Sequence, residues 1–447
     1  MLLLLSVLAC KHDGTLPDGL VSHGGDDTGD VTDDVPGDDS GSDDSGDDSA
    51  ADDTGIPPLD EDKDGYPSEL DCNDNDPDSY PGAKDPEGDG VDQDCNGYDG
   101  PPLPGIDEIQ VGDLVVSEIL IHSLGVDDAV GEWFEVSNVS KTGFDLDGLQ
   151  IGDGGSDSFV VGIPLALLPG EAAVFGASAD QAINGGVDVD YEYAGFTLDD
   201  KSDAIVLGNG LIVIDSVTYT VTDDVSWGEA ATRSLDPGHL DEGANDDSRS
   251  WCASTTAYGG GELGTPGATN NDCPALSPGD LMLGELVIDE VMTDPVAVDT
   301  QHGQWFEIYN ASLFTVNLEG LAVRIDDTEL YHLTTAFEVE SGGYAVIATD
   351  DDSTTNGGVD ADVEWPPGAT YQLSITDGDL SISNADEVLD GISWRSDNGF
   401  PETSGSSMSL DPKHQNALDN DAGTNWCSAT ATFGDGDYGT PGAGNGC

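Results

Sequence analysis

Short runs of β-branched and aromatic residues recur along most of the chain, and turns rich in Gly, Asp and Asn separate them. Residues 115–121, 133–136, 172–175 and 211–219 are examples. Runs of this length between turn residues are typical of β-strands, and no stretch has a convincing helical period. The pattern therefore predicts an all-β protein built from β-sandwiches.

The β-rich region consists of two copies of one segment. Gly-Asp-Leu-Val-Val-Ser-Glu at 112–118 returns as Gly-Glu-Leu-Val-Ile-Asp-Glu at 284–290, an offset of 172 positions. Glu-Trp-Phe-Glu-Val-Ser-Asn at 132–138 returns as Gln-Trp-Phe-Glu-Ile-Tyr-Asn at 304–310 with the same offset. Each copy also ends in Gly-Thr-Pro-Gly-Ala shortly before a cysteine. We predict two domains, at residues 112–273 and 284–447.

Several motifs of these copies resemble the lamin-tail domain. They are Glu-Trp-Phe-Glu followed by a polar turn, Asp-Leu-Asp-Gly-Leu at 145–149, Leu-Pro-Gly at 168–170 and the terminal Thr-Pro-Gly. The resemblance covers nearly all of both copies and implies two immunoglobulin-like β-sandwiches. Each copy is longer than the roughly 100 residues of that plan, so we expect the excess in loops and in the cysteine-bearing tail.

Four glutamates, Glu118, Glu135, Glu290 and Glu307, lie within the strand motifs. In strands a structural role, such as binding exposed backbone N–H groups, is a better explanation than acid–base catalysis. The sequence contains no catalytic constellation, so we do not expect an enzyme.

The seven cysteines divide into one single residue and three pairs. Cys10 follows an apolar leader, whereas the pairs are Cys72 and Cys95, Cys252 and Cys273, and Cys427 and Cys447. An odd number of cysteines in an exported chain requires a use for the remaining thiol. We predict three disulfides and a separate role for Cys10.

The leader indicates the role of Cys10. Residues 1–9 are apolar but too short to span a bilayer, as in the apolar core of a signal peptide. Leu-Ser-Val-Leu-Ala-Cys at 5–10 resembles a bacterial lipobox, which implies cleavage before Cys10 and lipidation of that residue. Residues 10–57 are rich in Asp, Ser and Gly and predict a disordered acidic spacer.

A candidate metal-binding module occupies residues 58–100. Asp60, Asp62 and Asp64 with Gly65 reproduce the start of an EF-hand loop, and Asp71 stands at its twelfth position. In such a loop the carboxylates converge on one ion, and Tyr66 offers its backbone carbonyl. Pro58 and Pro67 argue against the paired helices of a true EF-hand.

The rest of the module resembles a metal-binding repeat of bacterial surface proteins, akin to the calcium loops of thrombospondin type 3. One relative with this spacing is described as copper-binding. The candidate ligands beyond the first loop are Asn73, Asp74, Asn75, Asp76, Asp89, Asp92 and Asp94. The module contains no His or Met, which copper prefers, so we predict calcium.

The charge of the chain limits its partners. With 92 acidic and 10 basic residues the formal net charge is −82, which argues against direct binding of nucleic acid. We expect a calcium-binding protein, anchored by lipid to the bacterial outer membrane or cell surface, that displays its sandwiches to a surface protein or polysaccharide for adhesion, scaffolding or recognition. The alternatives are a hydrolase-associated or metal-dependent hydrolytic protein and a copper-binding surface protein.

Overall fold

The computed structural model describes residues 60–68, 70–86, 88–220, 231–326, 328–364, 372–385 and 387–447, with only the backbone of residues 328–330. The chain divides into two compact units, at residues 1–272 and 273–447. The leader, Cys10 and the acidic spacer lie outside the described residues. Within the described part, no helix is both long enough and apolar enough to cross a membrane.

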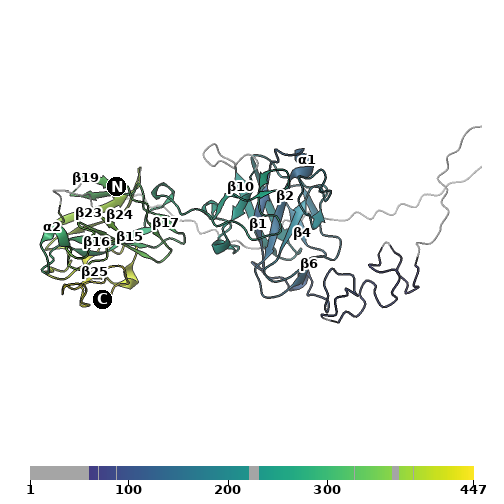
Figure 1. Ribbon diagram of the computed structural model, residues 1–447, viewed down its shortest axis with the longest axis horizontal. Helices are drawn as coiled ribbons and strands as arrows, with labels where there is room; N and C mark the ends of the chain where they lie inside the picture. Colours follow the sequence, from purple (N-terminus) through teal and green to yellow (C-terminus); the bar gives the residue numbers. More distant parts are fainter. Residues whose placement is uncertain are drawn as a thin grey trace, which may run out of the picture. The chain divides into compact units, whose positions relative to one another are not determined.

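The first unit contains a β-sandwich. Its larger sheet has the strand order β12-β11-β1-β2-β7-β8, and a second sheet has the order β10-β9-β4-β5. Figure 1 labels β1 and β2 of the larger sheet and β4 and β10 of the second. Two short pairs, β3-β6 and β13-β14, complete it. The strands are β1 (Leu114–Leu120), β2 (Trp133–Asn138), β3 (Phe144–Asp145), β4 (Gln150–Gly152), β5 (Ser158–Val160), β6 (Ala166–Leu167), β7 (Ala172–Gly176), β8 (Tyr191–Glu192), β9 (Ser202–Gly208), β10 (Val213–Thr220), β11 (Arg233–Leu235), β12 (Trp251–Ala253), β13 (Ala257–Tyr258) and β14 (Glu262–Leu263).

The second unit repeats this arrangement. Its sheets have the orders β26-β25-β15-β16-β21-β22 and β24-β23-β18-β19, with β17-β20 as the short pair. In each unit the one parallel pairing among the described strands lies at the end of the larger sheet. The strands are β15 (Leu286–Met292), β16 (Trp305–Asn310), β17 (Val316–Asn317), β18 (Ala322–Ile325), β19 (Thr328–His332), β20 (Glu338–Val339), β21 (Tyr344–Ala348), β22 (Val363–Glu364), β23 (Gly378–Ser383), β24 (Val388–Trp394), β25 (Met408–Leu410) and β26 (Trp426–Ser428).

Helices are confined to single turns in the described residues. The two α-helical turns each precede the second long strand of a unit, where an Asp side chain caps the first turn. The helical elements are η1 (Ile106–Glu108), α1 (Asp128–Gly131), η2 (Pro237–His239), η3 (Ser248–Ser250), η4 (Pro278–Asp280), α2 (Thr300–Gly303), η5 (Pro412–His414) and η6 (Gly423–Asn425). The predicted all-β, immunoglobulin-like sandwich fold is confirmed.

A hydrophobic core lies between the two sheets of each unit. In the first unit Phe134 and Phe175 from the larger sheet stack at 5.3 Å between ring centroids, and they share a core cluster with Ile205 and Ile214 from the smaller sheet. The second unit has an equivalent core, in which Phe306 and Ile347 of the larger sheet share a cluster with Leu380 and Ile392 of the smaller sheet. Burial of this apolar surface is the main stabilising contribution to each sandwich.

The strands β1 and β15 are buried on both faces. Every residue of β1 is buried, including Glu118, which has no exposed surface. The carboxylate of Glu118 accepts hydrogen bonds from the hydroxyls of Thr232 and Ser234 and from the backbone N–H of Thr265 at 3.0 Å. Glu118 thereby attaches the terminal Thr-Pro-Gly segment to the sheet, which is the structural role expected of it.

Residues 60–100 form no helix or strand where the structure describes them. Turns, Asp side chains and the Cys72–Cys95 disulfide, with Cα atoms 5.5 Å apart, connect this segment internally. The rings of Tyr66 and Tyr80 stack at 5.3 Å. Because such a module has little apolar surface to bury, its stability depends on the disulfide and on how its carboxylates are satisfied.

We predict that Glu118→Ala destabilises the first unit by about 3 kcal/mol, because it removes the acceptor of three buried hydroxyls and one buried N–H. Glu118→Gln keeps one carbonyl oxygen and should cost less. Denaturant unfolding of the full chain measures both variants. A Glu118→Ala protein as stable as the wild type would contradict this structural role.

Candidate metal centre

The first Asp-rich loop brings its predicted ligands together. Oxygen atoms of Asp62, Asp64 and Asp71 lie within 4.8 Å of one another, and so do those of Asp60, Asp62 and Asp74. The Asp60 carboxylate accepts hydrogen bonds from the backbone N–H groups of Lys63, at 2.6 Å, and of Gly65, at 3.3 Å. Gly65 has a φ of 108°, which a residue with a side chain rarely adopts.

Three carboxylate oxygens of this loop have no hydrogen-bond partner although they are buried. They are the Oδ2 atoms of Asp62, Asp64 and Asp71, and the whole Asp71 residue is only 8% exposed. Partial burial, with repulsion from Asp64, Asp71 and Asp60, raises the pKa of Asp62. No Lys, Arg or His side chain forms an ion pair with these carboxylates among the described residues. Converging oxygens without donors fit a bound cation.

The residues that follow Asp71 form a turn. The N–H of Asn73 donates to Asp71 Oδ1 at 2.8 Å, and the Asn73 carbonyl accepts from Asn75 and Asp76. Asp74 reaches back to the first loop, where its Oδ1 accepts from the N–H of Glu61 at 3.0 Å. Asn73 and Asn75 are exposed, so of this group Asp74 has the best position for a ligand. The N–H of Tyr66 donates to Asp64, which fixes the loop beside its predicted carbonyl ligand.

A second loop repeats the conformation of the first 32 positions later along the chain. Asp92, Asp94 and Asn96 have the spacing of the first three aspartates. Gly97 N–H donates to Asp92 Oδ2 at 2.8 Å, and Tyr98 N–H donates to Asn96 Oδ1 at 2.8 Å, the counterparts of the contacts made by Gly65 and Tyr66. The backbone conformation matches as well, because φ is 61° at Cys95 and 68° at Lys63, its equivalent in the first loop.

Asp85 extends this second loop and was not predicted. It is 4% exposed, and its Oδ1 atom has no hydrogen-bond partner. Burial raises the pKa of Asp94, and the negative charges of Asp85 and Asp92 add to the effect. Asp85 also has an oxygen within 4.8 Å of oxygens of Asp89 and Asp99. Asn96 could have been found from the repeated spacing, whereas Asp85 has no spacing signal because folding brings it close.

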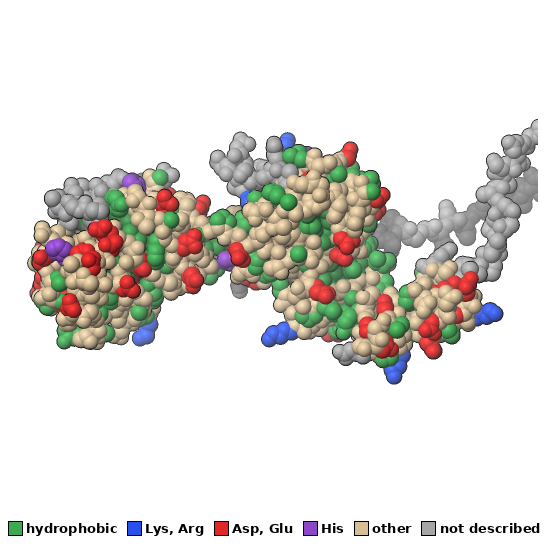
Figure 2. All heavy atoms as spheres, viewed as in Figure 1, with side chains coloured by type: hydrophobic (Ala, Val, Ile, Leu, Met, Phe, Trp, Pro, Cys, Tyr) green, Lys and Arg blue, Asp and Glu red, His purple; other side chains and the backbone are tan. Residues whose placement is uncertain are grey.

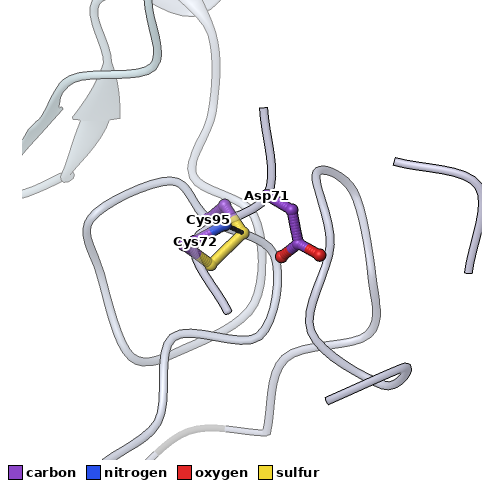
Figure 3. A group of neighbouring side chains, drawn as sticks. All are labelled: Asp71, Cys72 and Cys95. Atoms are coloured by element: carbon purple, nitrogen blue, oxygen red, sulfur yellow. Dashed lines mark hydrogen bonds between the residues drawn. A yellow bond between two sulfur atoms is a disulfide. The ribbon is translucent and has the colours of Figure 1, made fainter. Parts of the chain in front are cut away.

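The sulfur atoms of the module are bonded to each other. Cys72 and Cys95 form the disulfide that joins the two loops, and Figure 3 shows the Asp71 side chain beside it. Cys427 and Cys447 also form a disulfide, and Cys252 and Cys273 are disulfide-bonded. A disulfide sulfur is a poor metal ligand compared with a thiolate, so the donors that remain in the module are carboxylate, amide and backbone oxygens. This set suits a hard cation.

Both sandwiches also bury carboxylates, in different surroundings. In the first unit Ser117 donates to Glu135 Oε1 at 2.6 Å, and Gly267 N–H donates to Oε2 at 2.8 Å. Burial, with Glu118 and Asp190 nearby, raises the pKa of Glu135 to about 8.

In the second unit Asp289 takes the place of Ser117. A β-bulge places Asp289 and Glu290 opposite Glu307, and all three residues have no exposed surface. Asp289 Oδ1 and Glu307 Oε1 have no described donor. Burial, with repulsion from Asp289 and Glu290, raises the pKa of Glu307 well above its usual range, and burial also raises the pKa of Asp289. A proton held between the two side chains would satisfy both free oxygens.

Comparisons with known proteins identify two segments. Residues 283–398 match the family model of the Lamin Tail Domain, and residues 71–99 match the model named "Putative metal-binding motif". No curated protein and no solved structure matches the chain significantly. The second copy therefore contains a lamin-tail domain, and the acidic module contains a metal-binding motif. The lamin-tail resemblance of the first copy stays a prediction, although its strand order equals that of the second.

We predict that the second unit loses stability as the pH rises from 5 to 9. A carboxyl group whose pKa is raised by folding stabilises the folded state fully below its unfolded value and loses that contribution as the pH approaches the folded value. One such proton changes the free energy of unfolding by about 1.4 kcal/mol per pH unit. Calorimetry of the full chain measures this slope.

The matched variant for this measurement is Asp289→Ser, which restores the residue found in the first copy. Its hydroxyl can donate to Glu307 as Ser117 donates to Glu135. Because Glu135, which has such a serine beside it, has a pKa of about 8, the slope of the variant's second unit should persist below pH 8 and decrease above it. An unchanged slope above pH 8 would mean that the Asp289–Glu307 pair does not hold the proton.

Proposed function

We propose that this chain is a calcium-binding protein of the bacterial cell envelope, anchored through a lipid at Cys10, that displays two sandwich domains to a surface protein or polysaccharide. The observation that carries the calcium assignment is the set of buried, unpartnered Asp oxygens in the two loops. We propose no enzymatic activity.

Two loops, rather than one, support calcium binding. Asp60, Asp62, Asp64 and Asp71 supply oxygen atoms in the first, and Asp85, Asp92, Asp94 and Asn96 are the candidate ligands in the second. Calcium takes six to eight oxygen ligands in flexible geometry, which loops stabilised by turns can provide. Each ion would replace repulsion between neighbouring carboxylates by attraction and would order the module around the Cys72–Cys95 disulfide.

Copper is the competing metal, because one relative of the repeat is described as copper-binding. Copper prefers imidazole, thiolate and thioether ligands. Residues 60–100 contain no His or Met, and their two cysteines are joined in a disulfide. The donor set therefore favours calcium.

The proposed display role is supported by the surface of the sandwiches. Figure 2 shows Asp and Glu side chains distributed over the face in view, with few Lys and Arg. A strongly anionic surface suits partners that are cationic or that bind through divalent cations, and it disfavours direct contact with anionic polymers. The spacer at residues 10–57 would keep these domains away from the membrane.

We predict that the full chain binds two calcium ions with defined affinity, and that Asp62→Asn and Asp94→Asn each remove one of them. The matched control is Asp107→Asn, which changes the net charge equally at an exposed position outside the loops. Equilibrium dialysis at about 0.15 M salt, which screens diffuse binding to exposed charges, counts the ions.

The same samples show whether calcium orders the module. At a calcium concentration 100 times Kd, binding should stabilise it by about 2.7 kcal/mol and slow the reduction of the Cys72–Cys95 disulfide. Equal ion counts in all four proteins, or tighter binding of copper than of calcium, would refute the calcium assignment.

We predict that Cys10→Ser releases the protein from the membrane fraction of a bacterial expression host and abolishes the mass added by lipidation. Mass spectrometry of the N-terminal peptide and fractionation of cells measure both effects. Ser6→Ala is the control, because it changes the leader but keeps the cysteine. Membrane association that survives in Cys10→Ser would disprove the lipid anchor.

A further inference from the structure

The first sandwich contains a hollow, and larger side chains occupy the equivalent place in the second sandwich. The hollow has a volume of about 620 Å³, and it lies entirely within the first unit, between β2, β7 and the segment that follows the terminal Thr-Pro-Gly. Ser137 on β2 and Ala172 on β7 are cross-strand partners that line it, and Leu240 and Gly267 line it from other segments.

Larger side chains stand at the equivalent positions of the second unit. Tyr309 and Tyr344 are cross-strand partners there, with ring centroids 5.2 Å apart. Gln415, the equivalent of Leu240, donates to Asp289 Oδ2 at 3.0 Å and contacts the Tyr344 hydroxyl at 3.5 Å. Three substitutions to smaller or apolar side chains thus open the hollow in the first copy, so the hollow is not a property of the shared fold.

The lining of the hollow combines negative charge with apolar surface. Glu135, Glu171 and Asp190 line it, and no Lys, Arg or His is among its described lining residues. Leu165 and Leu167 add apolar wall. Glu135 is 1% exposed, and each of its oxygens accepts one hydrogen bond, so each keeps capacity for another donor. The described residues of the hollow therefore offer these carboxylates no positive group, and a cationic ligand could supply one.

We propose that this hollow binds an alkylammonium group, with the charged nitrogen at the carboxylates and the alkyl chain against the leucines. A carboxyl group that water hardly reaches gains more from a cation than an exposed carboxylate does, because the local dielectric is lower. The ammonium group comes from a free diamine or from a lysine side chain. The proposal is independent of the metal loops.

The raised pKa of Glu135 gives the binding a measurable signature. Because the pKa is about 8, the group is mostly protonated at pH 7, and a cation beside it favours its ionised form. Binding at pH 7 should therefore release up to about one proton. Calorimetry in two buffers of different ionisation enthalpy detects this release.

The test is calorimetric titration of the full chain, in the presence of calcium, with cadaverine and, separately, with Nα-acetyl-lysine methylamide. We expect saturable binding with proton release for at least one of them, and the tighter of the two identifies the source of the ammonium. Ser137→Tyr/Ala172→Tyr, which reproduces the second copy without changing the net charge, should weaken binding about tenfold or more. Its unfolding temperature verifies that it folds.

Two controls separate this site from diffuse attraction to a polyanion. The reciprocal variant Tyr309→Ser/Tyr344→Ala alters the second copy and should leave the affinity unchanged, and 1,5-pentanediol, which matches cadaverine without charge, should not bind. Equal binding by wild type and Ser137→Tyr/Ala172→Tyr, absence of proton release, loss of affinity in the reciprocal variant, or equal binding of the diol would overturn the proposal.

Discussion

A carboxylate removed from water needs a donor or a cation, and this chain can seldom offer it a basic side chain. It has 92 acidic residues and 10 Lys and Arg. A buried carboxylate must therefore be satisfied mainly by backbone N–H groups, by hydroxyls, by side-chain amides, by a proton or by a cation from solution. The structure uses the first two directly: Glu118 and Glu290 each accept from three hydroxyl side chains and a backbone N–H close to the end of the unit.

The two sandwiches show how little sequence change alters this balance. Ser117 on β1 and Asp289 on β15 lie at equivalent β-bulges of the two units. The serine donates a hydrogen bond to Glu135, whereas the aspartate adds a carboxyl group beside Glu307. The second unit then surrounds its carboxylates with Gln415, Asn445 and Tyr344, whereas the first leaves a hollow beside Glu135. Duplicated folds can thus differ in chemistry while strand order and core remain equal.

The fold class was largely predictable, because the β-branched runs and the repeated Trp-Phe-Glu motif mark the strand positions and the duplication in local sequence, whereas the sheet order was not predicted. The first loop was predictable for the same reason, since the spacing of Asp60, Asp62 and Asp64 makes them candidate ligands and the structure brings their oxygens together. Asp85 was not, because its approach to Asp94 depends on the turns between them. The hollow was also hidden, since it requires knowing that Ser137 and Ala172 face each other across two strands.

The same constraint gives the two parts of the chain different responses to their surroundings. In residues 60–100 the unpartnered oxygens belong to a segment with little apolar core, so the cation proposed for it would contribute much of its order. The sandwiches have large hydrophobic cores of their own, so loss of a proton from a buried carboxyl group would lower their stability but would not remove that apolar burial. If the module binds calcium as proposed, the cation would change the order of residues 60–100 and would leave the strand pairing and the cores of the two sandwiches as they are.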